Sequence, residues 1–221
     1  MYDKEILLFD LDGTITDSQP GITRSAAYAL ERFGIHVEDP STLKFFVGPP
    51  LRDSFMSHYS FSSDDADRAV AVYREYYSEK GIFENEVYDG IPQLLADLKE
   101  NGKRIIMATS KPTVFAKRIL EHFSLDQYFE FVSGAELSGV RDNKDEVIEY
   151  ALEQCGITDR SRCVMIGDRK HDILGAKKTG LESLGVLYGY GDRAELEAAG
   201  ADRIAEDVNE LWDILLGLPF Y

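Results

Sequence analysis

The stretch Ile6-Leu7-Leu8-Phe9-Asp10-Leu11-Asp12-Gly13-Thr14 decides how the rest of the chain is interpreted. Its four apolar residues predict a short strand buried on both faces, as in a parallel sheet. Ligands of such sheets gather at the carboxyl ends of the strands, so we expect Asp10 at the mouth of a site. Asp10 and Asp12 should not both stand unpaired there, because like charges repel. A magnesium ion, which prefers oxygen ligands, would resolve the repulsion.

Length and composition are typical of a globular protein. The 221 residues suffice for one large domain, or for a core domain that carries a smaller one. No apolar run approaches the roughly 18–20 residues of a membrane span. The N-terminal residues lack a signal core, and the two cysteines have no metal or redox spacing. We therefore expect a cytoplasmic protein that has no membrane partner and is a monomer or a homodimer.

The formal net charge of −16 limits the possible partners. Such an acidic surface repels nucleic acid phosphates, so no nucleic acid polymer is expected as a partner. The same charge repels small phosphate esters at long range. A site for a phosphorylated metabolite would therefore need local positive charge from a metal, backbone N–H groups and a few lysines or arginines.

The middle of the chain has a helical pattern and no convincing strand. Ser62 offers an N-cap for one of its helices. The predicted helices span residues 21–33, 52–59 and about 62–80. We therefore expect residues 17–86 to form a small all-helical domain inserted after the first strand, and residues 1–16 and 87–221 to form the core.

From Tyr88 onwards, predicted strands and helices alternate. The expected strands span residues 104–108, 129–133, 163–167 and 183–187. The expected helices begin near residues 92, 112, 143, 172 and 208. This alternation predicts an α/β fold, with a Rossmann-like parallel sheet covered by helices on both faces.

Polar and charged side chains follow further strands of the core. Thr109 and Ser110 end one strand, where their hydroxyl and N–H groups suit a phosphoryl oxygen or simply cap the next helix. Lys144 begins a helix, a position that mildly disfavours cations; an exposed lysine there could be removed at little cost in stability. Asp168 ends a strand and Asp172 follows one helical turn later, so both carboxylates can reach one ion or its bound waters.

Together these motifs resemble those of the haloacid dehalogenase-like phosphatases. Residues 10–14 are similar to the first motif of the family, although an ordinary strand-ending turn would also fit them alone. Thr109 is similar to the second motif, and Lys144 is similar to the third, a lysine that pairs with the nucleophilic aspartate and the phosphate. Gly167-Asp168 with Asp172 is similar to the fourth, metal-binding motif. The resemblance covers essentially the whole chain and is to phosphoglycolate phosphatases and a related 5′-nucleotidase-like group.

The resemblance implies magnesium-dependent hydrolysis of phosphate monoesters of the phosphoglycolate or 5′-nucleotide type. Asp10 would attack phosphorus and form an aspartyl phosphate, while Asp12 would act first as an acid and then as a base. The implied magnesium ligands are Asp10, the Asp12 backbone carbonyl and Asp168, with Asp172 in support. The groups that would offset charge on the phosphoryl oxygens are Thr109, the Ser110 N–H and Lys144.

The helical insertion is similar to the cap domain of the family, which closes over the substrate. Arg52, which follows the Gly48-Pro49-Pro50 turn, is either a substrate contact or a plain helix-starting arginine. A phosphosugar mutase resembling β-phosphoglucomutase is an alternative function. Such mutases carry a histidine after the first motif, and residues 19–23 contain none. A non-enzymatic phosphate-binding role is a third alternative, although nothing structural needs these charges clustered.

One further motif suggests a different ligand. Gly189-Tyr190-Gly191-Asp192-Arg193-Ala194 fits a dinucleotide-binding fingerprint with alanine in third place. It follows the fifth predicted strand instead of opening the first βαβ unit, as that mechanism requires. We therefore expect no dinucleotide at this motif.

Overall fold

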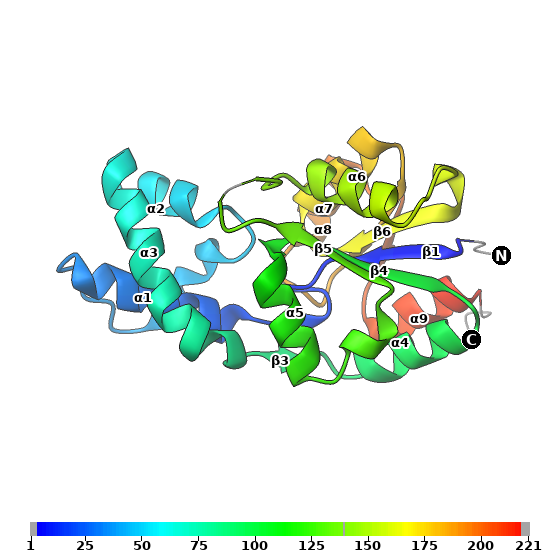
Figure 1. Ribbon diagram of the computed structural model, residues 1–221, viewed down its shortest axis with the longest axis horizontal. Coiled ribbons are helices and arrows are strands. Elements are labelled where there is room, and N and C mark those ends of the chain that lie inside the picture. Colours follow the sequence, from blue (N-terminus) through cyan, green and yellow to red (C-terminus); the bar gives the residue numbers. More distant parts are fainter. Residues whose placement is uncertain (1–3, 139, 218–221) are drawn as a thin grey trace. The chain divides into compact units, whose positions relative to one another are not determined.

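The computed structural model describes residues 4–138 and 140–217. Within these ranges, six parallel strands form one sheet in the order β5-β4-β1-β6-β7-β8 (Figure 1). All residues of β1 are buried, as its apolar run predicts. The strands are β1 (Ile6–Phe9), β4 (Arg104–Pro112), β5 (Phe131–Ala135), β6 (Cys163–Gly167), β7 (Glu182–Val186) and β8 (Arg203–Ala205).

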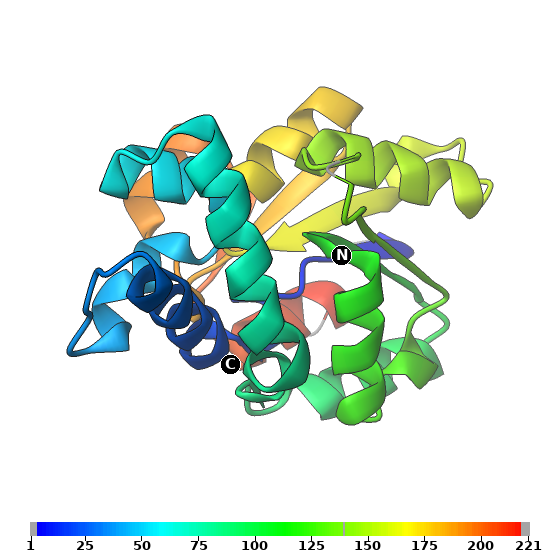
Figure 2. The same cartoon turned by 60° about the vertical axis from the view of Figure 1, so that its left-hand side comes forward.

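Helices cover both faces of the sheet (Figures 1 and 2), which confirms the predicted Rossmann-like α/β fold. On the face of α6 and α7, Val147 and Ala176 belong to the same buried cluster as Leu8 and Met165. The other face carries α4, α5 and α9. The helices of this unit are α4 (Ile91–Glu100), α5 (Thr113–His122), α6 (Lys144–Gln154), α7 (Lys170–Thr179), α8 (Arg193–Ala199) and α9 (Val208–Leu216).

Several elements differ from the sequence-based expectation; α8 and the two-residue strands Thr16–Asp17 and Glu86–Val87 were not predicted at all, and three strands of the main sheet differ as follows. β5 begins two residues late, because residues 126–128 form a 3-10 turn. β8 was not predicted, since it is a three-residue edge strand with one fully buried side chain. β4 continues past its apolar run to Pro112, and its register against β5 shifts between Thr109 and Pro112.

The helical segment is a compact unit of its own. The structure divides into residues 1–16 with 87–221 and residues 17–86. The chain passes between these units through two short strands, β2 (Thr16–Asp17) and β3 (Glu86–Val87), which pair with each other. The helices of the second unit are α1 (Gln19–Arg32), α2 (Leu51–Tyr59) and α3 (Ser63–Glu79), with 3-10 helices η1 (Pro40–Phe46) and η2 (Gly81–Phe83).

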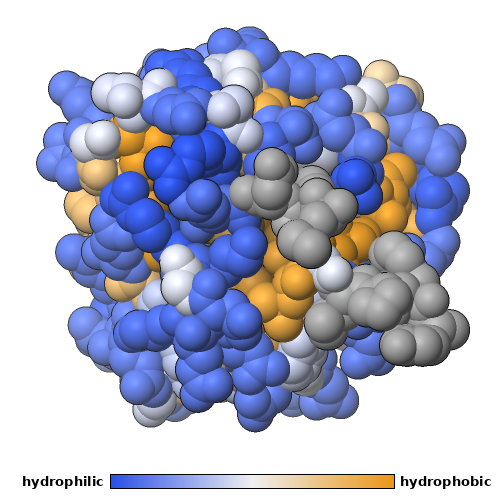
Figure 3. Space-filling view, turned by 90° about the vertical axis from the view of Figure 1, so that its right-hand side faces the viewer, coloured by the Kyte–Doolittle hydropathy of each residue, from blue (hydrophilic) through white to orange (hydrophobic). Residues whose placement is uncertain are grey.

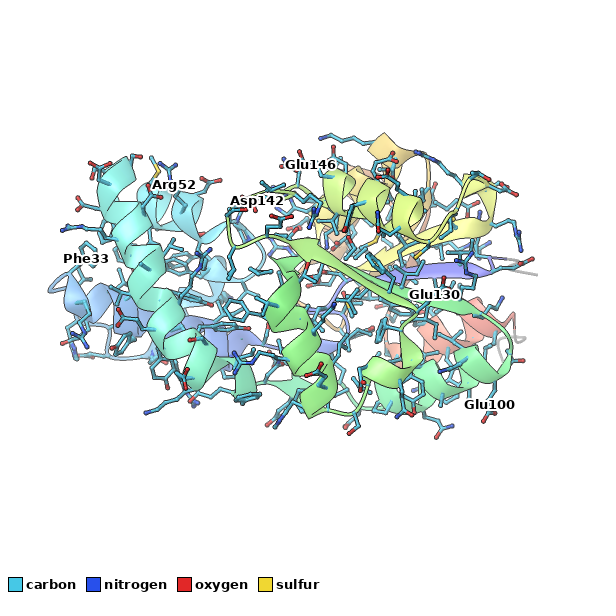
Figure 4. The ribbon with its side chains drawn as sticks, viewed as in Figure 1. Phe33, Arg52, Glu100, Glu130, Asp142 and Glu146 are labelled. Atoms are coloured by element: carbon cyan, nitrogen blue, oxygen red, sulfur yellow. The ribbon has the colours of Figure 1, made fainter. Side chains whose placement is uncertain are left out.

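Aromatic side chains fill the interior of the helical unit. Phe55 is fully buried, with its ring centroid 4.8 Å from that of Phe46 and 5.7 Å from that of Phe61. Phe61 in turn lies 4.8 Å from Phe33, the residue labelled at the end of α1 in Figure 4. These contacts join α1, η1 and α2, so aromatic packing holds the unit together.

Charged and polar side chains dominate the surface seen in Figure 3, with apolar residues confined to smaller areas between them. This distribution agrees with 29 % charged residues in the chain. Among the described residues, no helix combines the length and the apolar character that crossing a bilayer demands.

Phe55→Ala should lower the free energy of unfolding by about 3–5 kcal/mol, because it removes a fully buried ring and leaves a cavity. Phe83→Ala is the matched control in the same unit: this side chain is 41 % exposed, and its loss should cost less than about 1 kcal/mol. Urea unfolding of both variants measures the difference. Equal losses would show that the aromatic cluster does not stabilise the unit.

Candidate active site

The carboxyl ends of neighbouring strands assemble the site. β1 lies between β4 and β6, so the residues that follow these strands meet at one edge of the sheet. Asp10 follows β1 and its N–H donates to the Ile166 carbonyl at 2.9 Å. Asp168 follows β6 and Thr109 lies near the end of β4; both are buried. The structure thus brings together three of the predicted residues, each from a different strand.

Lys144 is the cation that contacts Asp10 and Asp172. Its Nζ lies 2.8 Å from Asp10 Oδ1 and 2.8 Å from Asp172 Oδ1, and donates to the Ala108 carbonyl at 3.0 Å. Only 6 % of the residue is exposed, so the expectation of an exposed lysine is wrong. Burial opposes its charge, but Asp10 and Asp172 raise the pKa of Lys144 above its ordinary value. The two carboxylates offset the cost of burying the ammonium group.

The start of α6 explains how Lys144 reaches this position. Asn143 and Glu146 form a capping box, in which the Asn143 N–H donates to Glu146 Oε2 at 3.2 Å (Glu146 is labelled in Figure 4). Glu146 also favours the helix start through its negative charge. The cap fixes the residue at which the helix begins. It therefore determines that the side chain of the first helical residue, Lys144, points towards the carboxylates.

Three carboxylates of the site lie close to one another. Asp10, Asp168 and Asp172 each offer an oxygen atom within 4.8 Å of the others. Burial raises the pKa of Asp10 to about 6, with Lys144 opposing the rise and Asp172 adding to it. Burial, Asp172 and Asp10 raise the pKa of Asp168 well above its usual value. One ammonium cannot neutralise three buried carboxylates, and their oxygen atoms are the donor set of a hard divalent cation.

The segment after β7 holds Asp168 in place. The Tyr190 N–H donates to Asp168 Oδ2 at 2.7 Å, and the hydroxyl of the half-buried Tyr188 donates to the Thr14 carbonyl at 3.0 Å. A Cβ on Gly189 would lie 2.4 Å from the Asp168 Cβ, and one on Gly191 would lie 1.9 Å from the Asp168 carbonyl oxygen. The glycines of the apparent dinucleotide motif are therefore needed for close approach to Asp168.

Asp12 is paired with a residue that the motifs did not indicate. Lys111 Nζ lies 2.7 Å from Asp12 Oδ2. Lys111 belongs to the end of β4, where its N–H donates to Thr109 Oγ1 at 3.2 Å. Ser110 lies between them, within the stretch where β4 changes register. The sequence signal for Lys111 was its place beside Thr109, at the end of a strand in a chain of net charge −16.

Arg52 lies in the helical unit and is engaged there. It belongs to α2 and is labelled in Figure 4. Its Nε donates to Asp67 Oδ1 at 2.8 Å, and its Nη2 donates to the Ser63 hydroxyl. These partners belong to α3, so Arg52 links two helices of the unit. Its side chain is 43 % exposed, and a role in contacting substrate stays a prediction.

The chain is similar to known proteins over nearly its whole length. A model of the haloacid dehalogenase-like hydrolases matches residues 7–186. A 5′-nucleotidase of Pseudomonas aeruginosa is 45 % identical over 209 residues, which are 95 % of this chain and 94 % of that protein. A phosphoglycolate phosphatase of Colwellia psychrerythraea is 30 % identical over 219 residues, 96 % of each chain. Tyrosine-protein kinase PtkA of Mycobacterium tuberculosis is 40 % identical over 187 residues, which are 85 % of this chain and 63 % of PtkA.

A solved structure agrees with these relatives. The crystal structure of a predicted phosphatase from Clostridium acetobutylicum superposes with a TM-score of 0.93 at 50 % identity, covering 97 % of this chain and 99 % of that one. The family resemblance stated from the motifs is thus confirmed. This chain belongs to the haloacid dehalogenase-like hydrolases and is an enzyme of the phosphatase type.

Proposed function

We propose that the enzyme is a magnesium-dependent phosphatase that hydrolyses small phosphate monoesters of the 5′-nucleotide type through an aspartyl phosphate on Asp10. The observation that carries the proposal is the buried position of Lys144 between Asp10 and Asp172, beside Asp168. Because Lys144 contacts the Asp10 carboxylate, it can also bind an anionic group, such as a phosphoryl group, that approaches Asp10. The remaining negative charge suits a divalent cation.

The carboxylates divide the chemistry between them. Asp10 attacks phosphorus, the ester P–O bond breaks, and Asp12 gives its proton to the leaving oxygen. Water then attacks phosphorus and gives a proton to Asp12, and the bond between Asp10 and phosphorus breaks. Inorganic phosphate leaves, and both carboxyl groups return to their starting states. Lys144 offsets negative charge on the phosphoryl oxygens, and the Thr109 hydroxyl and the Ser110 N–H donate to them.

Four residues would hold the magnesium ion. Asp10 and Asp168 supply carboxylate oxygens, Asp12 supplies its backbone carbonyl, and Asp172 supports the set. When bound, the ion would withdraw charge from the phosphoryl group. The side chain of Asp12 is left for proton transfer, since only its main chain is assigned to the metal.

The proposed substrate class rests on the named relatives. The 5′-nucleotidase is the more similar of the two named phosphatases, which supports a nucleotide over phosphoglycolate. The partner is then a small phosphorylated metabolite of the cytoplasm, with residues 17–86 acting as the cap. A phosphosugar mutase is a less favoured alternative, because residues 19–23 lack the histidine that such mutases carry.

A panel of phosphate esters tests the proposal directly. We expect 5′-nucleotides to release inorganic phosphate in the presence of magnesium, and excess EDTA to abolish that release. Phosphoglycolate, a hexose 1-phosphate and a phosphotyrosine peptide complete the panel, with isomerised sugar measured beside free phosphate. Asp10→Asn is the control, because an amide cannot form the aspartyl phosphate. Release that survives chelation would contradict the metal assignment, and preference for another ester would contradict the nucleotide assignment.

Asp12→Asn separates the two half-reactions. p-Nitrophenolate leaves with little protonation, so the variant should still transfer the phosphoryl group to Asp10. Hydrolysis of the aspartyl phosphate lacks its base, and steady turnover should fall about 10²–10⁴-fold. Rapid-mixing experiments should show a burst of p-nitrophenol close to one per enzyme, followed by slow release. Steady turnover near that of the wild type would rule out the proposed role of Asp12.

With metal removed by EDTA, the pH dependence of folding stability should report the buried charge of Asp10. Its pKa of about 6 in the folded state exceeds the value of 3.8 expected after unfolding, so the folded state binds the proton more tightly. This group therefore stabilises the fold at low pH and loses that contribution, about 3 kcal/mol at most, as pH rises from about 4 to about 6.

The measurement is the melting temperature of Asp10→Asn minus that of the wild type, which cancels the titration of other groups. In EDTA, this difference should move in favour of the variant as pH rises from about 4 to about 7. Added magnesium should move it back towards the wild type at neutral pH, because the ion binds the ionised carboxylate. A difference independent of pH would show that Asp10 is not under this electrostatic constraint.

A further inference from the structure

The ion pair between Lys111 and Asp12 has no assigned role in the chemistry above. Lys111 Nζ lies 2.7 Å from Asp12 Oδ2, and the two side chains are only 6 % and 15 % exposed. Burying an ammonium group to this extent costs desolvation free energy, unless a partner of opposite charge offsets that cost. The pair is therefore a fixed part of the site and not a surface contact.

The fold places Lys111 there through the end of β4. Residues 104–109 of β4 pair regularly with their neighbours, and the register then shifts before Pro112. On β5, a Cβ at Gly134 would lie 2.4 Å from the Lys111 carbonyl oxygen and 2.9 Å from the Thr113 nitrogen. A glycine at that position is what allows β4 to approach so closely while it changes register.

The two oxygen atoms of Asp12 have different surroundings. Oδ2 contacts Lys111, whereas Oδ1 is buried and accepts no hydrogen bond from any described residue. A buried carboxylate oxygen without a donor is costly, and such atoms mark positions where a ligand or a proton belongs. One oxygen is thus anchored and the other is left available for proton transfer.

We propose that Lys111 is a positioning residue for the acid–base step. It holds Asp12 through Oδ2, so that Oδ1 gives its proton to the leaving oxygen and later takes one from water. This inference rests on the proposed function, in which Asp12 is the acid and base. Without Lys111, the Asp12 side chain would sample other rotamers, and misplacement by about 1 Å can cost roughly 10²-fold in rate.

The two buried lysines of the site then have separate tasks. Lys144 contacts Asp10 and Asp172, whereas Lys111 contacts Asp12. Loss of Lys111 should therefore affect the step that depends on Asp12 and leave attack by Asp10 largely intact. Direct binding of a substrate anion by Lys111 would give a different result, since it would change KM whether or not Asp12 is present.

A double-mutant cycle on p-nitrophenyl phosphate tests the inference. Lys111→Met should lower steady turnover about 10–10²-fold, keep KM within about threefold, and produce a burst of p-nitrophenol. In the Asp12→Asn background the same substitution should change turnover less than about twofold, because the acid–base group that Lys111 positions is no longer present. Lys117→Met, which removes an exposed lysine of α5, should keep wild-type turnover in both backgrounds.

Each alternative has its own outcome. Equal losses in both backgrounds, with a raised KM, would overturn the inference and assign Lys111 to substrate binding. Equal losses with a lower melting temperature would assign it a structural role. If Lys111→Met does not fold, the same cycle with Lys111→Gln, which keeps a hydrogen-bond donor, decides the question. Failure of the proposed function itself would be visible separately, as absence of phosphate release by the wild type.

Discussion

The contact of Lys144 with two carboxylates at the edge of the sheet is the interaction on which the site depends. The ammonium group and the carboxylates of Asp10 and Asp172 are all buried, so each charge is stabilised by its partners of opposite charge. Breaking one such buried pair leaves an uncompensated charge and typically costs 3–5 kcal/mol. The same contact places the cation beside the nucleophile, so one arrangement serves stability and chemistry together. This coupling explains why the first residue of α6 cannot be treated as a surface lysine.

The rest of the site follows from crowding around these charges. Asp168 is held by the N–H of Tyr190, and the chain there passes so close that side chains at residues 189 and 191 would collide with it. Asp12 is fixed by Lys111 from the opposite neighbour of β1. Asp12 and Asp168 thus each have their own support, one from the end of β4 and one from the segment that follows β7. Rigid support of this kind is what preorganised catalysis requires.

Much of this could be predicted from the sequence, and for identifiable reasons. The apolar run before Asp10 and the alternation after Tyr88 give the parallel sheet, whose geometry brings Thr109 and Asp168 to the same edge. The pairing of Lys111 with Asp12 could not be predicted, because the direction of the Lys111 side chain depends on a register shift that Gly134 of another strand permits. The burial of Lys144 was missed because local sequence shows a helix start but not the carboxylates packed against it.

The pairing of β2 with β3 has a consequence for folding of the core. The two points at which the chain leaves and re-enters the core lie on hydrogen-bonded strands, about 5 Å apart. To the core, residues 17–86 are therefore an insertion whose ends are already closed. The entropic cost of closing a loop grows only as the logarithm of loop length, so even a long insertion adds little to the free-energy cost of folding the core. The core can thus carry helical inserts of different size and sequence, while β1 keeps its place between β4 and β6.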